Sequence, residues 1–252
     1  MYEKKSNSCG SLSGLIDIHS HILPGIDDGA RTERESLKML KMAAAAGIRE
    51  IIATPHFHYR RGKATPEKVK GTIARMQEML EVMKIPIRLY AGNELYYSHS
   101  LLDVVKAGEA LTMAGSDYVL LEFSPETEKR KIQHAVYQFL CEGYNPIIAH
   151  AERYQAFLKH MDFAEEISAM GAYLQVNSDS LCGNAGWRIK RFSKKLVEED
   201  LVSFAATDAH DTVERVPQFG KSIAWISKKY GQDQLQEYLI DNPKKILQNK
   251  TI

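Results

Sequence analysis

The sequence predicts an α/β protein in which parallel strands alternate with helices, arranged as one closed barrel or one open sheet. Seven short apolar or β-branched runs recur along the chain, and their first residues lie between 26 positions (146 to 172) and 39 positions (48 to 87) apart. This spacing leaves room for one helix and two loops between consecutive runs, which is the pattern of repeated strand–helix units. Histidine or carboxylate residues follow almost every run, as expected where parallel strands end at a common mouth.

Each expected strand is a run of four to six mostly apolar residues, the length typical of a buried parallel strand. In chain order, the runs are Leu15–Ile18, Ile48–Ala53, Ile87–Ala91, Tyr118–Leu121, Pro146–Ala149, Ala172–Val176 and Leu201–Ala205. Since the repeated units account for nearly all 252 residues, we expect one domain over residues 15–252, preceded by a tail over residues 1–14.

The helices between these strands have signals of their own. Thr32 and Glu35 have the spacing of a capping box, and Gly47 stands where a helix would end. Thr65 followed by Pro66 predicts an N-cap with proline in the first turn. One buried face is expected from Val69, Ile73, Met76, Leu80 and Met83. Later helices are expected to end at Gly143, Gly171 and Gly231.

The composition narrows the classes of function. Basic and acidic residues number 33 and 32, so a formal charge of +1 favours neither nucleic acid nor an anionic membrane surface as a partner. The three cysteines, Cys9, Cys141 and Cys182, are too widely spaced for a disulfide framework. The chain has no apolar run of transmembrane length and no signal-peptide pattern near Met1. We therefore expect a cytoplasmic protein without direct membrane insertion that holds any anionic ligand locally.

Metal-ligand residue types lie at or just after the ends of the expected strands. The set comprises His19 and His21 after the first run, Asp28 in the following loop, His56, Glu94, Glu122, His150, and Asp208 with His210 after the last run. Residues two apart on a strand point to the same side, so His19 and His21 can share one metal, as can Asp208 and His210.

Five histidines and four carboxylates at one mouth would be costly to bury without a compensating cation. Mixed imidazole and carboxylate ligands suit manganese, iron or zinc better than calcium, and nine ligands exceed the needs of a single ion. Two or three divalent ions are therefore expected. Such a cluster is typical of displacement at phosphorus, and Arg153 and Arg215 on the same rim are candidate phosphate ligands.

The motifs around these residues resemble a known family. In order, the chain contains IDIHSH at 16–21, PGIDDGA at 24–30, GNE at 92–94, LEFS at 121–124, HAERY at 150–154, QVNS at 175–178, TDAH at 207–210 and DNPKKI at 241–246. This series is similar to that of the PHP (polymerase and histidinol phosphatase) superfamily, in particular the CpsB/CapC type of bacterial tyrosine-protein phosphatase. The resemblance spans about residues 15–250.

The resemblance implies a distorted seven-stranded, TIM-like (βα) barrel with a trinuclear site, most often containing manganese. One metal would be held by His19, His21 and Asp208, with Glu94 bridging to a second held by Glu122 and His150; the third would be held by Asp28, His56 and His210. Arg153 and Arg215 match arginines with phosphate-binding or catalytic roles. In such enzymes a metal-bound hydroxide attacks phosphotyrosine, and the partner is a tyrosine kinase of capsule or exopolysaccharide synthesis.

The chemistry of the leaving group favours an aryl phosphate as substrate. Tyrosine leaves as a phenolate with a pKa of about 10, so a site without a dedicated general acid can still expel it. Tyr96, Tyr97 and the loop over residues 60–63 are positioned to flank an aromatic phosphopeptide, although rim packing explains them equally well.

Several other interpretations remain open at this point. A PHP-type histidinol phosphatase shares most ligands, although the DDGA and AERY segments favour the tyrosine phosphatase. Amidohydrolases also begin with His-x-His, but many need a strand-end lysine, and no expected strand ends in one. Cys182 and Arg188 have the spacing of thiol-dependent phosphatases, yet Leu181 and Ile189 replace the usual flanking residues. A non-catalytic metal-binding module is disfavoured because structural sites usually close with four ligands.

Overall fold

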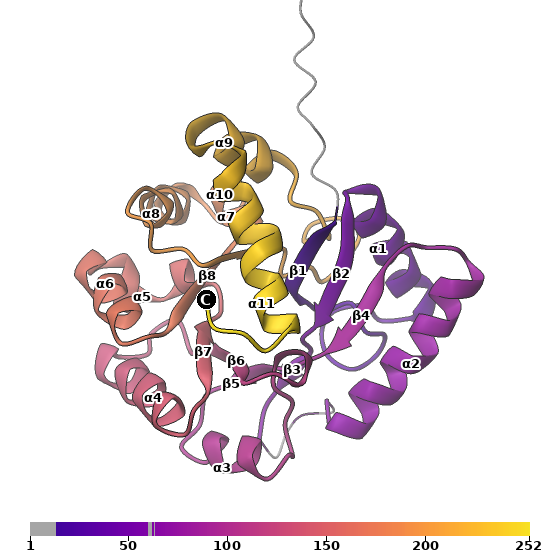
Figure 1. The fold of residues 1–252 in the computed structure, drawn as a ribbon, viewed down its shortest axis with the longest axis horizontal. Helices are drawn as coiled ribbons and strands as arrows, with labels where there is room; N and C mark the ends of the chain where they lie inside the picture. The colour runs from indigo at the N-terminus through magenta and orange to yellow at the C-terminus, as the bar shows by residue number, and fades with distance from the viewer. Residues whose placement is uncertain (1–13, 60–61, 63) are drawn as a thin grey trace, which may run out of the picture.

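All of the strand pairs in the structure are parallel, and together they form a curled sheet in two segments (Figure 1). The computed structural model describes residues 14–59, 62 and 64–252, so the expected tail lies outside the described residues apart from Gly14. The described strands are β1 (Leu15–Ser20), β2 (Ile48–Ala53), β3 (His56–Phe57), β4 (Arg88–Ala91), β5 (Glu94–Tyr96), β6 (Tyr118–Glu122), β7 (Asn145–Ile148), β8 (Tyr173–Asn177) and β9 (Phe204–Ala206). Their order is β1-β2-β4 in one segment and β3-β5-β6-β7-β8-β9 in the other.

Seven of these strands correspond to the predicted runs, and β3 and β5 are additional. β3 follows β2 after Thr54 and Pro55, and β5 follows β4 after Gly92 and Asn93. Pro55 has no N–H for the ladder, and a Cβ on Gly92 would lie 3.0 Å from Ile52. β2 and β4 end just before these two positions, and the chain continues into the other segment as β3 and β5. These interruptions place His56 and Glu94 opposite each other in the β3–β5 register.

The last strand returns to the first. Ser20 and Ala209 form an isolated parallel bridge, and the Asp208 amide donates to the carbonyl of His19 at 2.8 Å. The His21 amide likewise donates to the carbonyl of Ala209 at 2.8 Å. The chain after β9 is thereby held against the end of β1, which brings the first and last metal-ligand motifs together.

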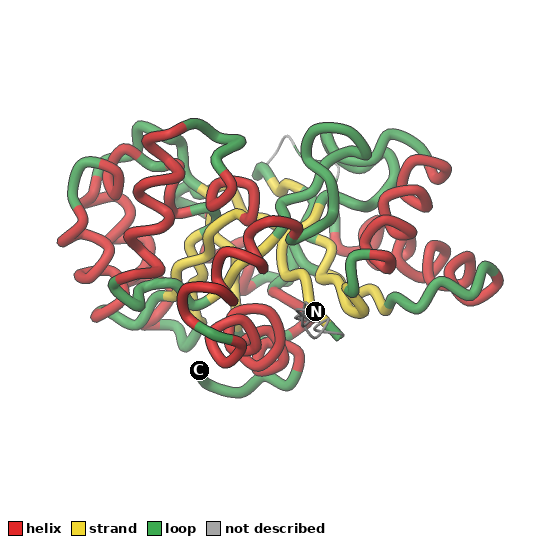
Figure 2. The backbone as a smooth tube through the Cα atoms, turned by 90° about the horizontal axis from the view of Figure 1, so that it is seen from above, coloured by secondary structure: helices red, strands yellow, loops and turns green. Residues whose placement is uncertain are grey.

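Helices surround the strands (Figure 1). The second view, turned by 90°, also shows most of the strands between helices (Figure 2). The α-helices are α1 (Glu33–Ala45), α2 (Pro66–Val82), α3 (Leu101–Lys106), α4 (Lys129–Cys141), α5 (Gln155–Leu158), α6 (Met161–Ala169), α7 (Ser178–Cys182), α8 (Trp187–Glu198), α9 (Gly220–Tyr230), α10 (Gln232–Gln236) and α11 (Asn242–Leu247). Short turns η1 (Met113–Gly115) and η2 (Ala151–Arg153) and the π-helical η3 (Glu237–Asp241) complete the described elements. Among the described residues, no helix is both long and apolar enough to cross a membrane.

The predicted caps are present, with two differences. Thr32 Oγ1 accepts from the Glu35 amide at 3.2 Å, but the Glu35 carboxylate reaches the amide of Arg31, one residue earlier than in a capping box. Thr65 caps α2 as expected. The prediction that Met83 lies on the buried face of α2 is wrong. Met83 is the C-cap residue, past the last helical turn, and is 43% exposed.

Two hydrophobic cores stabilise this arrangement. The larger core fills the space between strands and helices, whereas a smaller one joins strand residues such as Ile16 and Leu120 to Ile246 of α11. The C-terminal segment also binds strand starts, since Tyr118 at the start of β6 donates to the carbonyl of Lys250 at 2.8 Å. The amino ends of the strands are therefore covered, and the carboxyl ends are left for a functional site.

Candidate metal centre

The structure brings all nine predicted metal ligands together at the carboxyl ends of the strands. Within each of five groups of three or four side chains, the potential ligand atoms lie within 4.8 Å of one another. The groups are His21, Asp28, His56 and His210; His19, His21 and Glu94; His19, His150 and Asp208; Glu94, Glu122 and His150; and His56, His58 and Glu122. His58 is the one member that the sequence did not predict; its proximity to His56 was the only signal.

Glu94 is the centre of the cluster. Its fully buried carboxylate lies 3.2 Å from Nε2 of His19, 3.2 Å from Nε2 of His21, 2.9 Å from Nδ1 of His56 and 2.8 Å from Nε2 of His150. Four imidazoles, two of them within β1 and β3 and two just after β1 and β7, thus converge on one carboxylate that begins β5. A carboxylate in this position is well placed to bridge two cations.

Several of these atoms have no hydrogen-bond partner. Oε2 of Glu94, Nδ1 of His56 and Nε2 of His210 are buried without a hydrogen bond of acceptable geometry among the described residues. The 2.9 Å approach between His56 and Glu94 is therefore a close contact rather than an oriented hydrogen bond. Buried polar atoms are normally paired, so these lone pairs fit a group of divalent cations.

The charges of the protein's own groups also indicate that the site needs bound positive charge. Burial favours the neutral form of His56, but contacts with Glu122 and Glu94 outweigh it and raise the pKa of His56 to about 10. Burial likewise disfavours the charged form of Glu94, yet the surrounding histidines hold the pKa of Glu94 well below its usual range. The carboxylates thus remain ionised and require positive charge, which protons on imidazole or bound metal ions can supply.

A second layer of hydrogen bonds orients the histidines. Asp27 Oδ2 lies 2.6 Å from Nδ1 of His21, and Gln175 Oε1 lies 3.0 Å from Nδ1 of His19. Tyr154 Oη lies 3.2 Å from Nδ1 of His150. In each case one ring nitrogen is held while Nε2 faces the cluster, as is usual for metal-binding histidines.

The side-chain amides of Gln175 and Asn177, at the end of β8, extend this layer. Gln175 Nε2 donates to Asn177 Oδ1 at 2.7 Å, and Asn177 Nδ2 donates to Asp208 Oδ2 at 2.7 Å. Both residues belong to the QVNS motif at 175–178, but the sequence assigned them no role. Their contacts cross from β8 to β1 and to the chain after β9, so only the folded arrangement reveals them.

The backbone at the cluster is held in uncommon conformations. His150 and Asp208 adopt left-handed φ values of 33° and 51°, which are costly for residues other than glycine. Gly29 has no space for a side chain, since a Cβ there would lie 1.9 Å from the carbonyl oxygen of His21. This close approach lets the Ala30 amide donate to the same oxygen at 3.0 Å and positions the loop that carries Asp28.

Both predicted arginines lie on the rim. Arg153 Nη1 and Arg215 Nη2 contact Oδ2 of Asp208 at 3.0 and 2.5 Å, and each side chain is about one-third exposed. The Asp211 carboxylate accepts the amides of residues 213–215 and so orders the turn that presents Arg215. Two guanidinium groups with an exposed side next to the cluster can receive an oxyanion.

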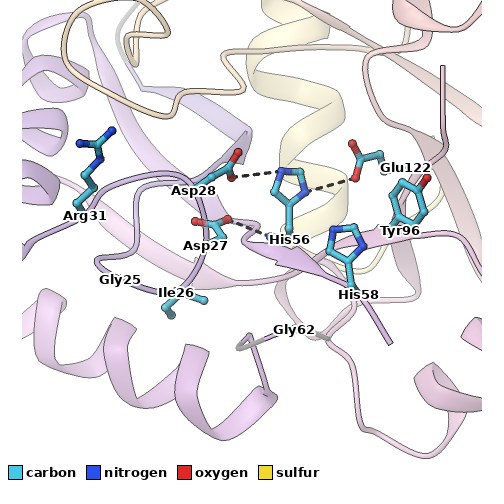
Figure 3. A pocket seen from close by; sticks show the side chains of 10 residues that line it. All are labelled: Gly25, Ile26, Asp27, Asp28, Arg31, His56, His58, Gly62, Tyr96 and Glu122. Carbon is cyan, nitrogen blue, oxygen red and sulfur yellow. Dashed lines mark hydrogen bonds and ion pairs between the residues drawn. The ribbon is translucent and has the colours of Figure 1, made fainter. Parts of the chain in front are cut away.

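The mouth is a cavity of about 670 Å³ (Figure 3). Its lining includes Asp28, His56 and Glu122 of the cluster, together with Arg31 and Tyr96. The ring of Tyr96 packs against that of His58, with centroids 4.8 Å apart. Of the predicted loop over residues 60–63, Gly62 lines this cavity, whereas Arg60, Arg61 and Lys63 lie outside the described residues.

The geometry disfavours a thiol nucleophile at Cys182. Burial and the neighbouring Asp179 raise the pKa of Cys182, the opposite of what an activated thiolate needs. The amides of Gly183 and Gly186 donate to carbonyls of the same turn, at 3.0 Å to Asp179 and 3.0 Å to Gly183 respectively. These amides are therefore not directed toward a bound phosphate.

Together, the fold and the site define an α/β protein with a candidate polynuclear metal centre at the carboxyl ends of its parallel strands. The chain belongs to the capsular polysaccharide synthesis family CpsB/CapC, whose model matches residues 15–248. It is 32% identical over 243 residues to the tyrosine-protein phosphatase CpsB of Streptococcus pneumoniae, covering 94% of this chain and 100% of that protein. The tyrosine-protein phosphatase YwqE of Bacillus subtilis is 34% identical over 239 residues, covering 94% and 93% respectively.

A solved structure from the study of YwqE and CpsB, described there as unique metal-dependent tyrosine phosphatases, has the same fold. It matches with a TM-score of 0.89 and 31% identity, over 94% of this chain and 96% of that one. The resemblance inferred from the motifs is thus confirmed.

Proposed function

We propose that this protein is a metal-dependent protein-tyrosine phosphatase, a phosphoric monoester hydrolase. The observation that carries the proposal is the cluster of five histidines and four carboxylates centred on Glu94, most of them buried. Among the described residues, Oε2 of Glu94, Nδ1 of His56 and Nε2 of His210 have no hydrogen bond of acceptable geometry. Relatives of the same family that match 94% of this chain are named tyrosine-protein phosphatases, and a solved relative is described as metal-dependent.

We assign the nine ligands to two or three divalent ions, manganese first, with iron and zinc as alternatives. In this assignment, one ion would be held by His19, His21 and Asp208. A second would be held by Glu122 and His150, with Glu94 shared between these two ions. A third would be held by Asp28, His56 and His210. The proximity of His21, Asp28, His56 and His210 supports the third group, and that of Glu94, Glu122 and His150 supports the second. When bound, such ions supply a Lewis acid and lower the pKa of coordinated water.

The protein's own residues bind and orient the substrate. Arg153 and Arg215 would take the phosphoryl oxygens through guanidinium hydrogen bonds and stabilise the charge that develops on them. The tyrosyl ring would leave across the mouth beside Tyr96 and His58. Because the phenolate is a good leaving group with a pKa of about 10, no separate general acid is required.

We further propose a barrel type, a phosphorylated partner and a cellular location for this protein. With β2 and β3 counted as one interrupted strand, and β4 and β5 as another, the strands would make the distorted seven-stranded barrel of the PHP type, within one domain over residues 15–252. We propose a bacterial tyrosine kinase of capsule or exopolysaccharide synthesis as the phosphorylated partner. Cytoplasmic location agrees with Cys141 and Cys182 both being free thiols.

The test combines metal analysis with a substrate panel. Purified protein is assayed for manganese, iron and zinc, and then with phosphotyrosine peptide, phosphoserine peptide, histidinol phosphate and p-nitrophenyl phosphate. We expect turnover of phosphotyrosine peptide to exceed that of the other two biological substrates and to vanish with a chelator. Efficient turnover of histidinol phosphate alone, or activity that survives complete metal removal, would refute the proposal.

A pair of variants separates the metal cluster from general charge effects. Glu94→Gln keeps the shape but removes the bridging charge, and we expect activity to fall by more than about 100-fold, beyond the effect of outer-layer residues. Glu81→Gln, on the exposed last turn of α2, makes the same chemical change away from the site and should leave activity unaltered.

A further inference from the structure

A second cavity, of about 370 Å³, lies next to the mouth of the metal centre. Tyr96 lines both cavities, which places them side by side at the ends of β5 and β6. Tyr96 is two residues beyond Glu94 along β5, a distance of about 7 Å. The volume lies at the lower end of the range for small-ligand sites, so it suits one side chain of a bound polypeptide rather than a folded domain.

The floor of this cavity is aromatic and fixed to the metal centre. Phe123 is buried and directly follows Glu122, and its ring lies 5.3 Å from that of Tyr97. The amide of Tyr97 donates to the carbonyl of Glu122 at 2.8 Å, and the amide of Phe123 donates to Oη of Tyr154 at 3.2 Å. A group bound on this floor is therefore held in a defined position relative to the cluster.

The rim of the cavity is cationic. Arg130, Lys131 and His134 of α4 line it together with His99, and none of its ten lining residues is acidic. Among the described residues, Arg130 and Lys131 make no ion pair, whereas the adjacent Lys129 lies 3.9 Å from Asp162. These two exposed cations are available to a ligand.

Two further features of the wall point to an anionic ligand. The cavity faces the first turn of α4, where the N-cap residue Glu128 makes no side-chain hydrogen bond to the helix amides. Oγ of Ser98, which lines the cavity, is buried without a hydrogen-bond partner among the described residues. The uncapped first turn of α4 supplies backbone donors that an anionic group could use, and the Ser98 hydroxyl is an unpaired group in the wall.

Resting on the proposed function, we infer that this cavity is a subsite for an anionic side chain of the substrate polypeptide close to the phosphotyrosine that is hydrolysed. The shared ligand chemistry is a carboxylate or a phosphate within reach of Arg130 and Lys131, over the aromatic floor of Tyr97 and Phe123. A phosphotyrosine here would use the floor and the rim together, whereas an aspartate or glutamate would use the rim. The protein would thus favour tyrosines in acidic or multiply phosphorylated segments.

The experiment uses metal-loaded, full-length protein and three sets of peptides. Each peptide has one phosphotyrosine, and its neighbours on either side are neutral, glutamate or a second phosphotyrosine. We expect KM for the charged sets to be about five- to tenfold lower than for the neutral set, with similar kcat, the size expected of partly exposed charge-assisted contacts. If both charged sets are preferred, the cavity accepts a carboxylate as well as a phosphate. If only the doubly phosphorylated set is preferred, the ligand of the cavity is a second phosphotyrosine.

The variant Arg130→Gln/Lys131→Gln should abolish this preference while leaving p-nitrophenyl phosphate turnover within about twofold. Its matched control is Lys68→Gln/Lys70→Gln, which removes two exposed charges from α2, outside the cavity. Wild-type protein without the preference, or a variant that retains it, would overturn the inference. So would equal losses on the charged and neutral peptides.

A binding assay distinguishes failure of the subsite from failure of the proposed function. Fluorescence anisotropy is measured with the same peptides containing a non-hydrolysable phosphonate in place of the phosphotyrosine. If no phosphotyrosine peptide is hydrolysed, the proposed function fails, and the ratio of affinities for charged and neutral peptides still decides whether the cavity binds an anion.

Discussion

Asp27 offers the sharpest test of how the metal centre is held, because it orients the cluster without belonging to the proposed ligands. Its Oδ2 lies 2.6 Å from Nδ1 of His21 and accepts the amide of His56 at 3.0 Å, while Oδ1 accepts the amide of Gly29 at 3.0 Å. The substitution Asp27→Asn preserves size but replaces one acceptor oxygen with an NH₂ group. At least one of the three donors must then face another donor.

The expected cost follows from these contacts. The bond to His21 is charge-assisted and short, and outer carboxylates of metal-binding histidines typically contribute 10- to 100-fold in metal affinity, about 1.4 to 2.7 kcal/mol. Since His21 belongs to two of the close groups in the cluster, its reorientation should weaken more than one ion. We expect Asp27→Asn to lower metal affinity and kcat/KM by about this factor.

The assay is metal content by mass spectrometry after dialysis against a graded series of buffered free manganese, with kcat/KM measured on the same samples. Asp103→Asn, on the exposed side of α3, is the control for loss of one negative charge. Full metal content and full activity in Asp27→Asn at every free-metal level would show that the carboxylate does not orient His21.

Three further perturbations probe other parts of the site. Gly29→Ala places a Cβ 1.9 Å from the carbonyl oxygen of His21, so the chain must shift. We expect the free energy of unfolding to fall by about 1–3 kcal/mol, seen by calorimetry as a fall in Tm of several degrees. An unchanged Tm would contradict the close approach. Cys182→Ser should keep p-nitrophenyl phosphate turnover within about twofold, because burial and Asp179 raise the pKa of this thiol; abolished activity would instead favour a thiol mechanism. Arg215→Lys keeps the charge but loses the forked donors, and we expect kcat/KM to drop about 10-fold or more while metal content is unchanged; loss of metal would assign Arg215 a structural role through Asp208.

Much of the architecture could be predicted from local pattern. The seven apolar runs became strands to within about three residues of the expected bounds, because a parallel strand buried on both faces is almost continuously apolar. The runs did not reveal β3 and β5, since two- and three-residue strands contain too few residues for a pattern. Met83 was misplaced for a related reason: helical periodicity continues on paper beyond the residue at which α2 ends.

The candidate residues of the centre could be identified from the sequence alone. Parallel strands end at one edge, so the histidines and carboxylates that follow almost every strand are expected to lie near one another. How these residues meet became visible in the fold: Glu94 faces four imidazoles, Asp208 contacts two arginines, and Asp27 and Gln175 hold the outer ring nitrogens. These contacts join residues up to 156 positions apart, and they depend on sheet curvature, register shifts and backbone strain, which no local spacing encodes.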